Sequence, residues 1–286
     1  MQPKKFAVIG HPIAHSLSKP MHEAVFKKLN LPHTYDAIDI APENLKEFIQ
    51  SNSYDGINVT IPHKVEVMKF LNQISDEAKQ IQAVNTLKFI RYPDTPNSEN
   101  PNQKLKISGF NTDWIGFQNS FKEENISLEN KNILVIGAGG ASRAILISLK
   151  NSNAKIFLTN RTIQKAIDLN NQLNLNAEIL DYKLLTTNYK LPKVDIIVNT
   201  TSIGMHPNEN ESPIQKELLN PNHIIFDVVY NPLKTKLIQD AEEIGCKTIS
   251  GVNMLVHQGA ESLRIWLGIE PPIQTMKEAV LKNLTN

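Results

Sequence analysis

The sequence predicts an α/β protein built from two α/β domains. Strand-like and helix-like segments alternate along most of the chain. An apolar run, Ile133–Ile136, enters a glycine-rich turn that is followed by a helix-like segment, the pattern of a nucleotide-binding strand–turn–helix unit. The length of 286 residues suggests two domains, although one large domain is not excluded.

The N-terminal part is predicted to alternate strands with helices. Strands are expected over residues 6–10, 34–40, 56–61, 84–92 and 105–108, and helices over 20–29, 42–51 and 63–71. Met21, Val25, Phe26 and Leu29 recur at helical spacing, which predicts one buried face. The polar, proline-rich stretch 93–102 is expected to be a loop between two strands.

The central part, from about residue 113 to 250, carries the glycine turn and more strand candidates. These cover residues 154–159, 177–180, 195–199, 224–229 and 246–250. Helices between strands at this spacing predict a parallel sheet with right-handed crossovers. After Gly251 the pattern is helical to the end, with core candidates at Met254, Leu255, Leu263, Trp266 and Leu267. These last helices could pack on either domain.

Composition narrows the classes of protein. The chain is 41% apolar and 21% charged with a net charge of +1, so it offers no broad electrostatic case for nucleic-acid or membrane binding. The single cysteine, Cys246, excludes an internal disulfide and fits the cytoplasm, where we expect the protein to act. No apolar run approaches the length of a membrane helix, and the run near the N-terminus is too short for a signal peptide.

Two kinds of catalytic site are disfavoured by the motifs. His11, His15 and His22 lie close in sequence, but neither HExxH nor a Cys/His ligand spacing is present, so no metal site is expected. A serine hydrolase is poorly supported because the G-x-S-x-G elbow is missing.

The glycine turn predicts a dinucleotide site. Gly137 would allow the tight turn, and Gly139 would let the backbone approach a pyrophosphate at the start of a helix. NAD-binding chains commonly place an acidic residue roughly 20 positions further on, whereas this chain has Asn160, Arg161 and Thr162 there. A cation at that place favours the 2′-phosphate of NADP. The alternatives are an ordinary glycine turn, since the third motif position is Ser142, and a solvated Arg161.

Four short polar segments follow predicted strands, where α/β proteins place their ligands. The first contains Ser16 and Ser18, whose hydroxyls suit one carboxylate or could instead cap a helix. The second ends at Lys64, which could project into a cleft or be a solvated lysine. The third contains Asn85, a candidate for bonding a ligand hydroxyl or a turn asparagine.

The fourth polar segment contains Asn111 and Asp113, either of which could instead cap the following helix. With these segments in view, the chain resembles the shikimate dehydrogenase family over nearly its whole length. Nine runs match in the order of the family, namely residues 12–18, 58–64, 83–86, 111–113, 137–141, 160–162, 199–205, 227–232 and 254–260.

The resemblance implies a reversible, NADP-linked reduction of 3-dehydroshikimate to shikimate, on the route to chorismate and the aromatic amino acids. It implies that Lys64 and Asp113 form the catalytic pair, and the proton is assigned to the pair rather than to one member. The substrate-binding residues it implies are Ser16, Ser18, Thr60, Asn85, Tyr230 and Gln258. The NADP-binding residues it implies are Gly137, Ala138, Gly139, Gly140, Ala141, Asn160, Arg161, Thr162, Lys165, Thr201, Ser202, Met205, Val228 and Gly251.

The resemblance also implies the domain layout. A discontinuous substrate domain, residues 1–112 and 251–286 with a mostly parallel sheet, is expected to be separated by a cleft from a Rossmann-like NADP domain, residues 113–250. The expected partners are small molecules, and the expected assembly is a monomer or a homodimer. Rival interpretations are a quinate/shikimate dehydrogenase that uses NAD, a non-catalytic metabolite sensor on the same fold, and a folate-linked dehydrogenase.

Four positions depart from the family pattern, and one of them is Asn253, which stands where a Gly or a bulkier apolar residue is expected. His63 stands where a Phe is usual, Gln82 stands where a Gly is usual, and Lys19 separates Ser18 from Pro20. None of these departures removes a predicted catalytic residue, but they bear on the shape of the pocket.

Overall fold

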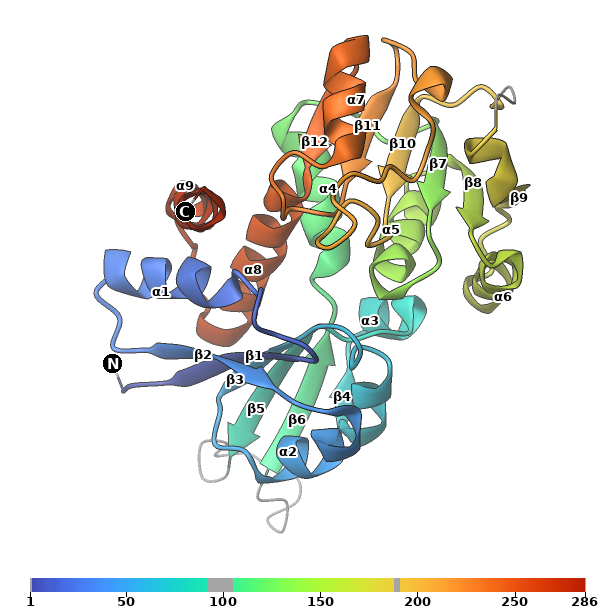
Figure 1. Cartoon of the computed structure of the whole chain (residues 1–286). Helices are drawn as coiled ribbons and strands as arrows, with labels where there is room; N and C mark the ends of the chain where they lie inside the picture. Colours follow the sequence, from blue (N-terminus) through green and yellow to red (C-terminus); the bar gives the residue numbers. More distant parts are fainter. Residues whose placement is uncertain (1, 92–104, 188–190, 286) are drawn as a thin grey trace. The chain divides into compact units, whose positions relative to one another are not determined.

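The computed structural model describes residues 2–91, 105–187 and 191–285. The chain divides into two compact units (Figure 1). The first unit comprises Met1–Thr112 and Gln258–Asn286, and the second comprises Asp113–His257. Each unit is an α/β layer structure around its own six-stranded sheet.

The sheet of the first unit has the strand order β2-β1-β3-β5-β6-β4. β1 runs parallel to β2 and β3, β5 runs antiparallel to β3 and β6, and β4 is parallel to β6, so the sheet is mostly parallel. The strands are β1 (Lys5–Gly10), β2 (Thr34–Asp39), β3 (Gly56–Val59), β4 (Gln73–Ile74), β5 (Thr86–Arg91) and β6 (Leu105–Phe110).

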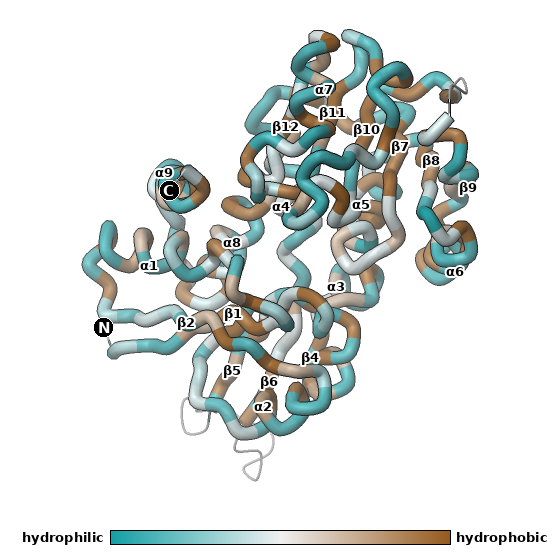
Figure 2. The backbone as a smooth tube through the Cα atoms, in the orientation of Figure 1, coloured by the Kyte–Doolittle hydropathy of each residue, from teal (hydrophilic) through white to brown (hydrophobic). Residues whose placement is uncertain are grey.

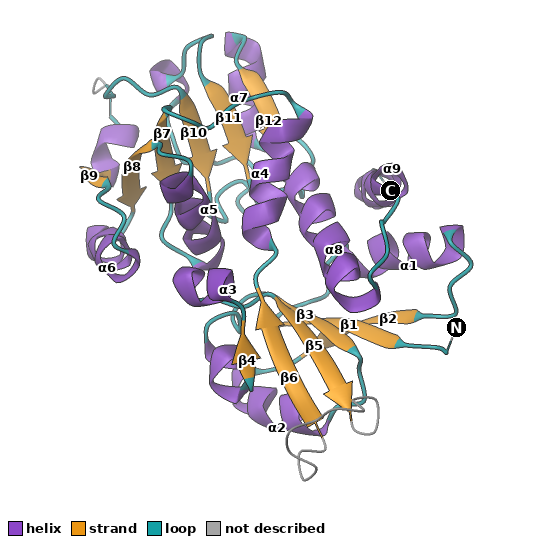
Figure 3. Ribbon diagram, turned by 180° about the vertical axis from the view of Figure 1, so that it is seen from behind, coloured by secondary structure: helices purple, strands orange, loops and turns teal. Residues whose placement is uncertain are grey.

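Helices cover both faces of this sheet, as the view from behind in Figure 3 shows. One face packs on α2 (Leu45–Ser51), which follows the short 3-10 helix η1 (Pro42–Asn44), and on η2 (Glu66–Phe70) and α3 (Asp76–Ile81). On the other face, Phe6 of β1 stacks on Trp266, at 4.8 Å between ring centroids, near the end of α8 (Gly251–Leu267). On this side α1 (Ser18–Lys28) packs against α9 (Ile273–Leu284).

The strand register of the first unit gathers the predicted polar segments at one sheet edge. Val59, the last residue of β3, is the register partner of Ile9 in the parallel neighbour β1. Thr86 begins the antiparallel strand β5 and is paired with Phe110, which ends β6. Three chain segments therefore meet at that edge, because an antiparallel strand starts where its neighbours end.

The sheet of the second unit is entirely parallel, with the order β12-β11-β10-β7-β8-β9. This is the doubly wound order of a Rossmann fold, with the switch in direction between β7 and β10. The strands are β7 (Asn132–Ile136), β8 (Lys155–Asn160), β9 (Glu178–Asp181), β10 (Ile196–Asn199), β11 (Ile224–Asp227) and β12 (Lys247–Ser250). The helices are α4 (Asp113–Glu123), α5 (Gly140–Asn151), α6 (Ile163–Leu173), α7 (Lys236–Ile244), and the 3-10 helices η3 (Tyr182–Leu185) and η4 (Lys216–Leu218).

The central strands of the second unit are apolar because they are covered on both faces, and Figure 2 shows β7 and β10 in the hydrophobic colour. On one face Phe117 and Phe121 of α4 pack with Phe226 of β11 at 5.1 and 5.5 Å between ring centroids. On the other face Leu237 and Ile238 of α7 join the strand residues in one buried cluster.

Several sequence predictions differ from the structure in detail. The segment 63–71 forms turns and the 3-10 helix η2 rather than one helix. The short elements β4 and α3 were missed, because two and six residues give too little periodicity to detect. Leu29 is 39% exposed because it lies past the last turn of α1, whereas Met21, Val25 and Phe26 are buried as predicted. The predicted loop 93–102 lies outside the described residues.

Candidate active site

The carboxyl ends of β3 and β6 and the start of β5 are tied together by backbone hydrogen bonds. Val84 N–H donates to the carbonyl of Lys64 at 2.8 Å, and Asn85 N–H donates to the carbonyl of Phe110 at 3.0 Å. His63 N–H donates to the carbonyl of Thr60 at 2.9 Å. The segments that carry Thr60, Lys64 and Asn85 are therefore neighbours at one edge of the first unit.

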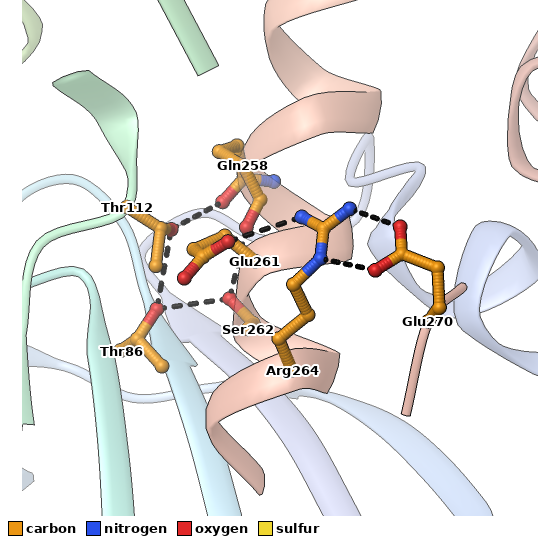
Figure 4. Close-up of polar contacts among 7 residues, drawn as sticks. All are labelled: Thr86, Thr112, Gln258, Glu261, Ser262, Arg264 and Glu270. Carbon is orange, nitrogen blue, oxygen red and sulfur yellow. Dashed lines mark hydrogen bonds and ion pairs between the residues drawn. The ribbon is translucent and has the colours of Figure 1, made fainter. Parts of the chain in front are cut away.

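The Asn85 side chain is fixed by the segment that follows β6. Thr112 N–H donates to Asn85 Oδ1 at 2.7 Å, which identifies that atom as the amide oxygen. The Asn85 Nδ2 donates to Thr112 Oγ1 at 3.0 Å and reaches Gln258 Oε1 at 3.5 Å. Gln258, in α8, also receives a contact from Thr112 Oγ1 at 3.5 Å (Figure 4). Two of the predicted substrate-binding residues thus lie side by side.

The two predicted catalytic residues belong to different units. Lys64 is half-buried in the first unit, at the turn that follows β3. Asp113 is buried and begins α4 of the second unit, directly after Thr112. Asp113 therefore directly follows Thr112, the residue that holds Asn85.

The segment with the two predicted carboxylate-binding serines begins α1. Ser18 is the first residue of the helix and is buried, and Ser16 is half-buried. Ser16 Oγ accepts the Ser18 N–H at 3.3 Å, while the N-cap position itself is Leu17, which makes no side-chain cap. The capping interpretation therefore applies at most to this local contact of Ser16.

Three of the departures from the family pattern have local structural explanations. His63 is buried, and its Nε2 donates to the Ile40 carbonyl at 2.7 Å, because a carbonyl oxygen only accepts. Gln82 ends α3 with φ of 57°, the left-handed conformation for which Gly is ordinarily preferred. Pro20 lies in the first turn of α1, where the N–H that it lacks has no intrahelical partner.

The glycine turn of the second unit has the form that a pyrophosphate site needs. Gly137 has φ of +116°, and a side chain there would collide with Thr200 Oγ1. At Gly139 an added Cβ would meet nothing within 4 Å, which leaves the backbone open to a ligand. Ala138 N–H donates to Asn160 Oδ1 at 3.2 Å, so the end of β8 holds the turn. Ser142 is fully buried and donates to the Gly139 carbonyl at 2.6 Å, which explains a serine at the third motif position.

The neighbouring segments carry the predicted cofactor residues. The turn after β7 and the Thr200–Thr201 segment after β10 meet at the switch point, where Thr200 N–H donates to the Ile136 carbonyl at 2.8 Å. Arg161, Thr162 and Lys165 are exposed at the start of α6. Arg161 and Lys165 thus place two cations where an NAD-binding chain has an acidic residue.

The remaining predicted residues of the second unit lie on the segments after β10, after β11 and at the start of α8. Ser202 and Met205 are exposed. Gly251 is buried against Val228, whose carbonyl oxygen would collide with a side chain there. Burial raises the pKa of the Tyr230 phenol, which keeps it in its neutral form.

A buried carboxylate that the sequence reasoning missed joins two of these segments. Asp227 is fully buried at the end of β11, where its Oδ1 accepts from Asn199 Nδ2 at 2.9 Å and from Val229 N–H at 3.0 Å. Its Oδ2 accepts from Thr235 Oγ1 at 2.7 Å. Burial raises the pKa of Asp227 to about 6, against the three hydrogen bonds. The signal in the sequence was an Asp at the end of an apolar strand, inside a family motif.

Asn199 passes this connection on to the predicted cofactor segment. Its Oδ1 accepts from both the N–H and the Oγ1 of Thr201, at 3.0 and 2.7 Å. Thr201 Oγ1 in turn accepts the Ile203 N–H at 3.2 Å. The segments that follow β10 and β11 are therefore held by one hydrogen-bond network.

Neither a metal-binding cluster nor a membrane-spanning helix is found among the described residues. Within these ranges no group of three or more His, Cys, Asp or Glu side chains could hold a metal ion. None of the helices that the structure describes is long and apolar enough to cross a membrane.

Three family models match the chain. A shikimate dehydrogenase substrate-binding domain matches residues 8–87, a shikimate/quinate 5-dehydrogenase model matches 119–230, and a shikimate 5′-dehydrogenase C-terminal domain matches 251–281. A relative from Methanococcus aeolicus, named shikimate dehydrogenase (NADP(+)), is 42% identical over 97% of each chain.

Solved structures agree over the same length. A crystal structure of a shikimate dehydrogenase in complex with NADP+ has a TM-score of 0.88 and 38% identity, covering 99% of this chain and 96% of that one. The enzyme from Thermus thermophilus in complex with NADP(H) and shikimate has a TM-score of 0.83 and 33% identity, covering 98% and 99%.

Proposed function

The chain belongs to the shikimate dehydrogenase family, and we propose that Lys64 and Asp113 carry the proton in its reaction. The protein is an NADP-dependent oxidoreductase that interconverts 3-dehydroshikimate and shikimate in the shikimate pathway, the route to chorismate and the aromatic amino acids. The observation that carries the assignment of the proton is the joining of the Lys64, Asn85 and Thr112 segments at one sheet edge.

The reaction needs a proton at one oxygen of the substrate. NADPH supplies the hydride when it is bound, and the ring ketone oxygen gains negative charge as the hydride arrives. The Lys64 ammonium would stabilise that charge and donate the proton, and the Asp113 carboxylate would orient the ammonium. In the oxidative direction the same pair would accept the proton of the hydroxyl.

The first unit supplies most of the proposed substrate contacts. Asn85 and Gln258, held side by side, would bond ring hydroxyls together with Thr60. Ser16 and Ser18 at the start of α1 would bind the carboxylate, with Tyr230 as a further contact from the second unit. Hydroxyl and amide groups suit this ligand because it offers several donors and acceptors around one ring.

The proposed cofactor contacts belong to the second unit. The turn Gly137–Ala141 would hold the pyrophosphate at the start of α5, and its fit is supported by the open space at Gly139. Asn160, Arg161, Thr162 and Lys165 would surround the 2′-phosphate. The nicotinamide side would be bordered by Thr201, Ser202, Met205, Val228 and Gly251.

The proposed domain division assigns residues 1–112 and 251–286 to the substrate domain and 113–250 to the NADP domain. The division by contacts falls seven residues later, after His257, because α8 runs without interruption from Gly251 to Leu267. We also propose that the enzyme acts in the cytoplasm. We further propose that it is a monomer or a homodimer, and light scattering of the purified protein would test this assembly.

The function is tested by following the absorbance of reduced nicotinamide. The protein is mixed with shikimate and NADP, and in matched reactions with quinate in place of shikimate or NAD in place of NADP. The proposal predicts the fastest reduction with shikimate and NADP. A second candidate is a quinate/shikimate dehydrogenase that uses NAD. The description of the family model that matches residues 119–230 names quinate beside shikimate, and this candidate predicts that quinate and NAD give rates comparable to those with shikimate and NADP.

A further inference from the structure

A chain of buried hydrogen bonds connects Tyr35, which packs against α1, with Asn85 inside the first unit. It runs through Tyr35 in β2, Asn58 in β3, and Thr86 in β5, with Ser262 of α8 beside it. All four side chains are buried, and none of them has a place in the proposed mechanism. Resting on the proposed function, we propose that this relay consists of positioning residues that set the Asn85 carboxamide as a hydrogen-bond donor to the substrate.

The number of protons on each group determines which atoms of the relay donate and which accept. Tyr35 Oη has one proton and donates it to Asn58 Oδ1 at 2.7 Å. This fixes the Asn58 amide, so that its Nδ2 donates to Ser262 Oγ at 2.8 Å and to Thr86 Oγ1 at 3.1 Å. An Asn58 side chain turned the other way would leave the Tyr35 proton without its acceptor Oδ1.

The far end of the relay reaches Asn85. Ser262 Oγ accepts from Asn58 and directs its own proton to the Gln258 carbonyl at 3.1 Å, while Thr86 Oγ1 lies 3.0 Å away (Figure 4). Thr86, which accepts from Asn58, directs its own proton to Asn85 Oδ1 at 3.1 Å. Asn85 Oδ1 therefore receives Thr86 O–H as well as Thr112 N–H, and the group presented on the other side of the carboxamide is the donor Nδ2.

The near end of the relay is held by aromatic packing. His22 stacks on Tyr35 at 4.2 Å between ring centroids with 10° between the planes, and its Nδ1 donates to the Ser18 carbonyl at 2.7 Å. Burial raises the pKa of Tyr35 well above its usual value, and a hydrogen bond from Ser18 opposes this shift. The phenol therefore stays protonated and remains a donor to Asn58 while it lies against Ser18, a proposed carboxylate-binding residue.

The consequence is that one internal network reaches both ends of the proposed substrate site. Loss of the Tyr35 proton donor would leave Asn58 Oδ1 with no partner from Tyr35, would permit the Asn58 amide to turn and would remove the donor that Thr86 Oγ1 accepts from. Thr86 would then hold Asn85 Oδ1 less firmly, and the Asn85 carboxamide would be less well positioned as a donor although Thr112 N–H still sets its orientation. The expected result is weaker binding of shikimate, with no change in the binding of NADP.

The test compares two conservative deletions in the relay with matched controls. Tyr35→Phe and Thr86→Val each remove one hydroxyl with little change in volume, and both should raise KM for shikimate about five- to tenfold. KM for NADP should stay within twofold. Thr86→Ser restores the hydroxyl and should return KM for shikimate toward the wild-type value. Tyr54→Phe, whose hydroxyl donates to Asp36 outside the relay at 2.9 Å, should leave both KM values unchanged.

The outcomes separate this proposal from the proposed function. A role in stability alone would lower the melting temperature of Tyr35→Phe and Thr86→Val and leave KM for shikimate unchanged, which would overturn the relay. If Tyr35→Phe fails to fold, the pair Thr86→Val and Thr86→Ser decides alone. In the Asn85→Ala arm, an unchanged KM for shikimate would refute the substrate role of Asn85 and the relay with it. A raised KM in Asn85→Ala beside unchanged values in the relay variants would refute only the relay.

Discussion

The polar interiors of the two units are built from different chemistry. In the first unit the buried network consists of neutral groups, namely a phenol, amides and hydroxyls, with a neutral imidazole packed on the phenol. In the second unit the corresponding network gathers around a carboxylate, Asp227, which accepts hydrogen bonds from Asn199, Val229 and Thr235.

The difference shows two ways of fixing the segments at a sheet edge. A neutral network assigns a donor or an acceptor role to each atom, which suits the recognition of ring hydroxyls. A buried carboxylate only accepts, so it can bind several N–H and O–H groups of neighbouring loops at once. The carboxylate carries an energetic cost that the neutral groups do not, because burial disfavours its charged form.

The largest effect is expected from the removal of the Lys64 ammonium, the proposed proton donor of the first unit. Lys64→Ala should lower kcat by about 10²- to 10⁴-fold and should affect KM for shikimate less, because the ammonium acts on charge that develops during the reaction. Initial rates of NADP reduction measure both constants. The matched control is Lys69→Ala, at an exposed lysine five residues after Lys64 that pairs with Glu66. Near-normal turnover of Lys64→Ala would exclude Lys64 as the proton carrier.

The cost of the buried carboxylate is the next largest effect. The pKa of Asp227 in the folded protein is raised from 3.8 to about 6, so this group favours folding below pH 4 and that contribution is lost as the pH rises through 6. The loss amounts to about 3 kcal/mol. Asp227→Asn cannot ionise, so its unfolding free energy relative to wild type should be higher at pH 7 than at pH 4. Equal differences at the two pH values, measured by urea unfolding, would contradict this.

The neutral imidazole of the first unit should give the opposite dependence on pH. Burial lowers the pKa of His22 from 6.5 to about 4, so its contribution to stability is present above pH 6.5 and is lost as the pH falls toward 4. The loss is again about 3 kcal/mol. His22→Gln should therefore be less destabilising, relative to wild type, at pH 4 than at pH 7. The same urea titrations measure this penalty. A penalty of His22→Gln that is equal at pH 4 and pH 7 would refute the assignment of His22 as a buried, neutral imidazole.

The phosphate assignment affects the second unit alone. Arg161→Ala should raise KM for NADP roughly tenfold to 100-fold, as expected for a lost hydrogen bond to a charged group, and should leave KM for NAD nearly unchanged. Arg161→Lys keeps the charge but not the fork geometry, and an intermediate value is expected. Equal losses for NADP and NAD in Arg161→Ala would remove the 2′-phosphate from this place.

The smallest effect is expected at Gln82. A residue with a side chain loses about 1–2 kcal/mol of stability in the left-handed conformation, and glycine avoids this loss. Glycine loses about 0.5–1 kcal/mol more than other residues in conformational entropy on folding, which offsets part of the gain. Gln82→Gly should therefore raise the unfolding free energy by about 1 kcal/mol and leave KM for shikimate unchanged. A changed KM would mean that the Gln82 side chain shapes the substrate site.

The fold could be predicted from the sequence because its strands are apolar runs at regular spacing, as at Ile133–Ile136 and Ile196–Asn199. The family followed from short motifs at the strand ends. The buried partners of those motifs could not be predicted, because Thr86 and Ser262 are 176 residues apart along the chain. A polar residue such as Asp227 has the same letter in a buried network as on the surface, and only the three-dimensional contacts tell the two apart.

The central claim is that Asn85 of the first unit recognises the substrate and Arg161 of the second unit recognises the cofactor, and paired KM values test it most directly. KM for shikimate and KM for NADP are measured for wild type, Asn85→Ala, Arg161→Ala and the double variant. The account predicts that Asn85→Ala raises only KM for shikimate, that Arg161→Ala raises only KM for NADP, and that the double variant shows both changes undiminished. A rise of both constants by similar factors in either single variant would contradict it.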